Sequence, residues 1–226
     1  MTTTSKSLII SWWLFFIISV FLWYRNYRFD RVLSGFILLL ALIQIFQYAF
    51  LNGSPAKSTA RLIYAVVWLQ PIVLFLGTFI YIKSSSFGNT TCNFLEKSAF
   101  ILFIVYIIVF IYKMIYMNDV FLKLKDDNIW WIQGEENTFT GGWDLVYWIG
   151  IILPLFMIFI ETGYKNLSII VLMLYAIFMA ILCYQKTDTR YYLSLWSNLA
   201  MGFALFSWMG GLFSESFQSN ENRPSW

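Results

Sequence analysis

Polar, tryptophan and proline residues interrupt three long apolar segments of this chain, and they are the residues that could do chemistry. They are Gln44 and Gln47 in the second apolar segment, Trp68, Gln70 and Pro71 in the third, and Ser194, Trp196 and Asn198 in the last. A polar group in hydrocarbon is costly unless it is hydrogen-bonded, so such side chains usually face the interior of a helical bundle. Amides beside tryptophan rings suit a small neutral polar solute, which they can bind by hydrogen bonds and stacking.

The spacing of these residues also allows a purely structural role. Gln44 and Gln47 are three residues apart and share one helix face, and Ser194 and Asn198 are four apart. Amides and small residues often join neighbouring membrane helices by hydrogen bonds and close packing. Pro71 has no N–H, so it predicts a bend near the middle of its helix. We predict that Gln44, Gln70 and Asn198 meet in one interior polar cluster, which either role would use.

Seven apolar runs must position these residues, and each is close to the ~20 helical residues that cross a bilayer. The sequence therefore predicts an all-α fold, a seven-helix transmembrane bundle in one domain (1–213), followed by a polar tail (214–226). A first run rich in Trp and Phe, with Arg25 in place of a cleavage site, favours a retained helix over a signal peptide. The predicted spans are residues 8–24, 32–51, 62–82, 99–117, 145–160, 167–184 and 191–213.

Composition excludes several functional classes. Hydrophobic residues make up 60% of the chain and charged residues 12%, against about 25% in soluble domains. A net charge of +3, spread along the chain, does not indicate nucleic-acid binding, so the expected partner is the lipid bilayer. The chain has no histidine, and its two cysteines fall near opposite membrane faces. We therefore expect no metal, no cofactor, no disulfide and no enzymatic activity, and the last span lacks the lysine that a retinal protein needs.

Basic residues near the first span predict its orientation. Arg25, Arg28 and Arg31 follow this span, whereas only Lys6 precedes it. The positive-inside rule then places the N-terminus outside and the C-terminus in the cytosol. Lys113 lies one turn from the end of its span, and we expect its ammonium group to snorkel to the headgroups. The sequence leaves open which membrane the chain occupies and whether it forms a homo-oligomer.

The one long connection, residues 118–144, predicts a small hairpin. Ile129-Trp-Trp-Ile132 and Thr138-Phe-Thr140 flank Gly134-Glu-Glu-Asn137, a pattern of two short β-prone stretches around a Gly-containing turn. Such a hairpin could cover the mouth of the bundle as a lid. The alternative, which we favour, is that it lies on the headgroups, anchored by its tryptophans.

The polar residues of the second and third spans resemble a known pattern. Gln44-Ile-Phe-Gln47, then Ser58-Thr59, then Tyr64-Ala-Val-Val-Trp-Leu-Gln-Pro71 is similar to an uncharacterised polytopic membrane protein family of large algal and amoebal DNA viruses. Members show a "WLQP" box and a Ser-X-Trp element, here Ser194-Leu-Trp196. The resemblance covers residues 31–77 and 190–210, and it departs at Ser197, where a Cys is expected. It implies a virion or host-membrane component with no known activity.

A second resemblance links the chain to the sugar-transporter class built as three helices, a linker helix and three helices. Trp68-X-Gln70 and Trp196-X-Asn198 occupy corresponding places in the two halves, after Arg61 and Arg190. This resemblance implies a carrier or channel for a small neutral polar solute, bound between the second, third and seventh spans. Against it, the order here is Gln-Pro where that class has Pro-Gln. The sequence thus favours a non-enzymatic viral-type membrane protein of unknown function, with solute transport as the alternative.

Overall fold

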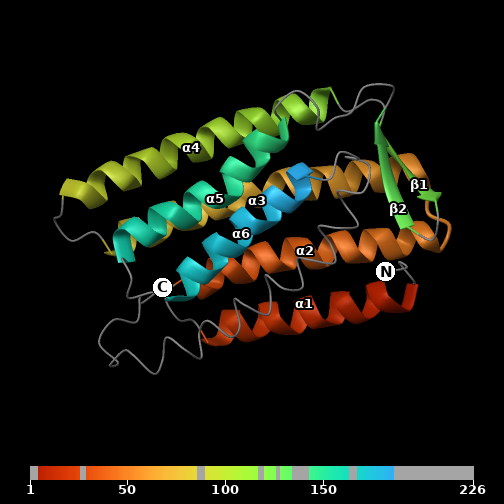
Figure 1. Ribbon diagram of the computed structural model, residues 1–226, viewed down its shortest axis with the longest axis horizontal. Helices are drawn as coiled ribbons and strands as arrows, with labels where there is room; N and C mark the ends of the chain where they lie inside the picture. Colours follow the sequence, from red (N-terminus) through yellow and green to blue (C-terminus); the bar gives the residue numbers. More distant parts are fainter. Residues whose placement is uncertain are drawn as a thin grey trace.

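A computed structural model describes residues 5–25, 29–85, 90–116, 120–125, 128–133, 143–162 and 167–185. Within these ranges it has six helices and one two-stranded antiparallel ribbon (Figure 1). The helices are α1 (Ser5–Arg25), α2 (Asp30–Leu51), α3 (Ala56–Ser85), α4 (Thr90–Ile115), α5 (Trp143–Thr162) and α6 (Leu167–Gln185). The strands are β1 (Val120–Lys125) and β2 (Asn128–Gln133).

Four of these helices, α1 to α4, are long and apolar enough to cross a membrane. They indicate a membrane-embedded protein, as the composition predicts. Shorter apolar stretches lie within α5 and α6, at Leu145–Ile160 and Ile169–Phe178. Each of the first six predicted spans falls on a helix, although α4 ends at Ile115, slightly before its predicted end. The seventh predicted span (191–213) and the polar tail (214–226) lie outside the described residues, so a count of seven stays a prediction.

Helix α3 occupies the centre of the described bundle. It packs against α2, α4 and α5, and β1 lies against it as well, whereas α1 contacts α2 and α6 contacts α5. Successive helices run in opposite directions, so the N-terminus, the start of α3, the end of α4 and the ribbon lie at one end (Figure 1). Among the four long helices α3 is the most buried and α4 the least. The interior is therefore organised around α3, which carries Trp68, Gln70 and Pro71.

Glycines let the backbones of α2 and α3 approach closely. A Cβ atom added at Gly77 would lie 2.2 Å from Cγ1 of Val32, which is far inside van der Waals contact. At Gly35, one turn further along α2 from Val32, an added Cβ would lie 3.4 Å from Cγ1 of Val73 and would fit. Small residues at helix crossings allow this contact in membrane bundles, where packing rather than hydrophobic burial drives association.

Polar contacts join α1 to α2 at two levels. In the interior, Ser34 Oγ donates to the Ser19 carbonyl at 2.7 Å, and Ser19 Oγ donates to the Ser34 carbonyl at 3.0 Å. At the connection between the helices, Arg25 Nε and Nη2 donate to the two Asp30 carboxylate oxygens at 2.6 and 2.7 Å. This bidentate pair ties the last residue of α1 to the first residue of α2, where a carboxylate also suits the helix macrodipole.

The ribbon lies in the long connection, and its strand β2 contains the predicted β-prone stretch 129–132. The strands pair from Val120 with Gln133 to Lys125 with Asn128, so only Asp126 and Asp127 connect them. The predicted turn at 134–137 and the second stretch at 138–140 lie outside the described residues, whereas 129–132 pairs with the segment that precedes it. Residues 122–125 alternate apolar and charged side chains, and a two-residue connection lets strand 120–125 pair directly with 128–133. Leu122 and Ile129 are buried, which fixes the register on one face of the ribbon.

Candidate interior polar site

A buried hydrogen bond between α3 and α5 forms the centre of the candidate site. The Tyr147 hydroxyl donates to Oε1 of Gln70 at 2.5 Å, and both side chains are buried. Gln70 is 0% exposed, as expected for an amide that cannot face lipid without losing its hydrogen bonds. Its Nε2 atom has no hydrogen-bond partner within the described residues. The amide therefore has its acceptor satisfied and a donor still available.

Aromatic rings surround this hydrogen bond. The Trp68 ring meets the Tyr147 ring edge-to-face at 6.0 Å, and it also lies 6.4 Å from the Tyr64 ring, one turn earlier on α3. Tyr147 in turn meets Trp148 at 5.5 Å. All four rings are buried. Edge-to-face contacts of this kind hold rings in fixed orientations, so the Tyr147 hydroxyl is directed at Gln70 by its neighbours.

Lys113 of α4 adds a positive charge to the same cluster. Its Nζ lies 5.5 Å from the centroid of the Trp68 ring, within the range of a cation–π interaction. The side chain is only 6% exposed. The expected snorkelling of Lys113 to the headgroups is therefore wrong, because the Trp68 face offers the ammonium group a favourable place inside the bundle. The lysine, the tryptophan, the tyrosine and the amide form a continuous series of contacts across α4, α3 and α5.

A close crossing of three helices determines the geometry beside the polar cluster. A Cβ atom added at Gly150 would lie 2.5 Å from Cε1 of Tyr106 and 2.7 Å from Cβ of Pro71. The Tyr106 hydroxyl donates to the Val146 carbonyl at 2.6 Å, which ties α4 to the first turn of α5. Helix α3 continues through Pro71. Because Gly150 has no side chain, α5 can lie against Pro71. This contact fixes the position of Tyr147 along the α3 axis, next to Gln70.

The structure places the remaining predicted residues as follows. Gln44 and Gln47 are both buried on α2 and, as predicted from their spacing, lie on the same helix face. Trp68 and Gln70 come together with Tyr147, and Pro71 lies beside them at the α3–α5 crossing. Ser194, Trp196 and Asn198 lie outside the described residues. The predicted meeting of Gln44, Gln70 and Asn198 therefore stays a prediction.

The sequence did not identify four members of the cluster as site residues: Tyr64, Lys113, Tyr147 and Trp148. Tyr64 belongs to the sequence box of the third span, and Tyr147 lies within the apolar run 145–160. A weak signal was present, since a tyrosine inside an apolar span carries a hydroxyl that needs a partner. Which partner it finds depends on the packing of distant helices, and the sequence does not show this.

The four long apolar helices indicate a membrane-embedded protein, and its described interior holds a polar cluster between α3, α4 and α5. No protein-family model matches the chain, and no curated protein matches it either.

Proposed function

We propose that this chain is a non-enzymatic multi-pass membrane protein that binds and carries a small polar solute at the cluster of Trp68, Gln70, Lys113 and Tyr147. The observation that supports transport is the Nε2 donor of Gln70, which is fully buried and without a partner among the described residues. An unsatisfied buried donor costs about 1–3 kcal/mol. A solute with an oxygen acceptor would satisfy this donor and recover that cost.

The surrounding groups suit such a solute. The Tyr147 hydroxyl and the Gln70 amide can form hydrogen bonds with such a solute, and the Trp68 ring supplies an aromatic surface beside them. The ammonium group of Lys113 lies on the Trp68 ring, so a positive charge borders the cluster. Polar and ionisable groups inside a membrane bundle commonly mark a solute pathway. The predicted contribution of Asn198 from residues 191–213 would complete the site.

A second candidate is a structural component of a virion or host membrane, the role that the viral-family resemblance implies. One observation favours it: the Gln70 acceptor is already satisfied inside the protein by Tyr147. Interhelical hydrogen bonds of this kind average about 0.6 kcal/mol in membrane bundles and reach about 2 kcal/mol. In this case the cluster would hold α3, α4 and α5 together, and no solute would enter it.

Uptake into proteoliposomes separates the two candidates. Wild type and Gln70→Leu would be reconstituted and tested with radiolabelled glycerol, glucose and glycine, and the purified proteins tested for thermal stabilisation by the same solutes. A carrier predicts uptake that Gln70→Leu abolishes while the variant stays folded. The matched control is Thr78→Val, which removes another buried polar group of α3 about two turns away and should leave uptake intact. Lower stability of Gln70→Leu, with no solute response in wild type, would establish the structural role.

A further inference from the structure

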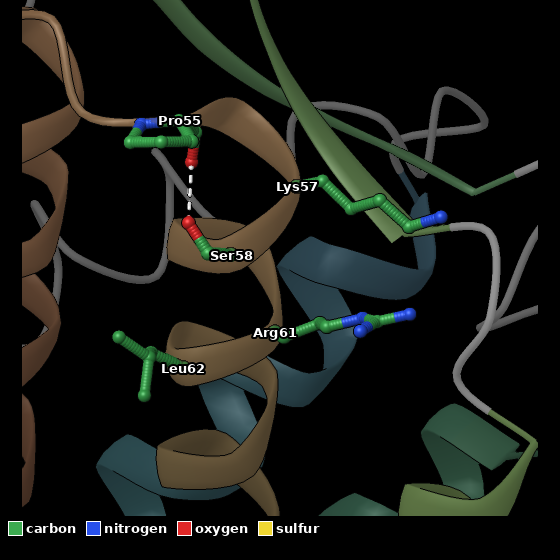
Figure 2. Close-up of a pocket in the computed structure, with 5 residues that line it drawn as sticks. All are labelled: Pro55, Lys57, Ser58, Arg61 and Leu62. Carbon is green, nitrogen blue, oxygen red and sulfur yellow. Dashed lines mark hydrogen bonds between the residues drawn. The ribbon is translucent and has the colours of Figure 1, made fainter.

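A cleft at the start of α3 has the chemistry of an anion site, and it lies away from the interior polar cluster. Its volume is about 520 Å³, and it is lined by Pro55, Lys57, Ser58, Arg61 and Leu62 (Figure 2). Lys57 and Arg61 project to one side of α3, Leu62 projects to the other, and Ser58 lies between them (Figure 2). The cleft therefore has one basic wall and one apolar wall.

Three sources of positive potential meet at this cleft. Lys57 and Arg61 lie one turn apart on the exposed surface, where like charges repel each other. The N-terminal end of a helix carries a partial positive charge, and the first turn of α3 has no acidic residue to offset it. Ser58 Oγ donates to the Pro55 carbonyl at 3.1 Å, which holds this first turn in place. A bound anion would relieve both the repulsion and the uncompensated helix end.

The depth of the cleft in the membrane indicates where such an anion comes from. Helix α3 has 30 residues, about 45 Å at 1.5 Å per residue, whereas a bilayer core is about 30 Å thick. The apolar part of the helix begins at Leu62, which is 50% exposed. The first turn of α3 therefore lies at the depth of the lipid headgroups, and Leu62 lies where the hydrocarbon core begins. A ligand that fits both walls has a negatively charged head and an apolar chain.

We propose that Lys57, Ser58, Arg61 and Leu62 form a binding site for an anionic phospholipid. The headgroup phosphate contacts the lysine and arginine, since a guanidinium binds phosphate with two parallel hydrogen bonds and an ammonium binds it as a point charge. The first part of the acyl chain lies against Leu62. This site is independent of solute transport, and its test does not involve uptake.

Lipid titration of the purified full chain tests the site. The protein in neutral detergent would be titrated with dioctanoyl phosphatidylglycerol, and the bound fraction measured by native mass spectrometry. Lys57→Gln/Arg61→Gln should bind up to about 30-fold more weakly, because each exposed ion pair with the headgroup phosphate contributes up to about a factor of five. The charge-keeping pair Lys57→Arg/Arg61→Lys should bind within about twofold of wild type.

Two controls decide between a specific site and general charge attraction. Lys83→Gln/Lys97→Gln removes the same two charges near the opposite end of α3 and should leave lipid binding unchanged. Equal loss in both double variants, or no loss in Lys57→Gln/Arg61→Gln, would refute the site. Inorganic phosphate and dioctanoyl phosphatidylcholine are titrated in parallel. If phosphate alone stabilises the protein as strongly as the anionic lipid, the ligand is a free anion and the lipid assignment is wrong.

Discussion

The hydroxyl of Tyr147 donates a 2.5 Å hydrogen bond to Oε1 of Gln70, a residue 77 positions earlier in the chain. It joins the middle of α3 to the first part of α5 inside the bundle. We expect Tyr147→Phe to lower the free energy of unfolding by about 0.5–2 kcal/mol, because the amide oxygen loses its partner while the ring packing is kept.

A double-mutant cycle with Gln70→Leu would measure this bond in reversible unfolding experiments in mixed micelles. Tyr147→Phe should cost much less in the Gln70→Leu background than in wild type, since the acceptor is then absent. Strictly additive effects of the two substitutions would mean that the hydrogen bond contributes nothing to stability.

Alanine substitutions at Gly77 and Gly35 test the close packing of α2 against α3. Gly77→Ala should destabilise the fold by about 1–3 kcal/mol, because its new methyl group would overlap Val32. Gly35→Ala should be neutral or slightly stabilising, since its methyl group would fit beside Val73 and alanine favours the helix. The measurement is the same unfolding free energy.

Removing the clashing side chain should rescue the first variant. Val32→Ala combined with Gly77→Ala should be more stable than Gly77→Ala alone, since Val32 supplies the overlapping atoms. A double variant no more stable than Gly77→Ala would show that α2 and α3 do not cross at these residues.

The Arg25–Asp30 pair should matter for the α1–α2 connection. Both side chains are largely buried, at 10% and 6% exposure, and the contact is bidentate. Asp30→Asn should lower stability by about 2–4 kcal/mol, because it leaves the guanidinium without its countercharge. Arg25→Gln/Asp30→Asn should cost less than the sum of the single changes. Glu96→Gln on α4 is the control for the loss of one carboxylate. If it lowers the free energy of unfolding as much as Asp30→Asn does, the Arg25–Asp30 pair makes no specific contribution to stability.

The orientation predicted from Arg25, Arg28 and Arg31 can be tested with reporter fusions. Fusions after residues 56, 120 and 188 should all lie on the same side as the N-terminus, outside, if the chain has seven spans. A fusion after residue 220 should lie on the cytosolic side. Any one of the first three on the opposite face from the other two would contradict the seven-span topology. All four reporters with their sides exchanged would keep that topology and reverse the orientation.

The positions of the helices were predictable because the signal is local. A run of about 20 apolar residues without charge is sufficient to specify a spanning helix, since hydrocarbon tolerates only backbone that bonds within itself. The burial of Gln44, Gln47 and Gln70 follows from the same argument, because an amide facing lipid loses its hydrogen bonds. The sequence could therefore predict the membrane environment, the six described helices and the inward direction of these three amides.

The partners of those residues were decided by the tertiary structure. The rotation of one helix and its shift along a neighbouring helix depend on side chains that are far apart in the sequence. An example is the close contact of Gly150 with Pro71 and Tyr106. The contact of Lys113 with Trp68 could not be predicted from the sequence for the same reason. A lysine near a helix end can reach either the headgroups or an aromatic ring of a neighbouring helix. Residues 128–133 pair with 120–125 because strand register depends on which side chains become buried, here Leu122 and Ile129. The composition of each segment determines which of its side chains are buried. Contacts between segments depend on how all the segments pack together.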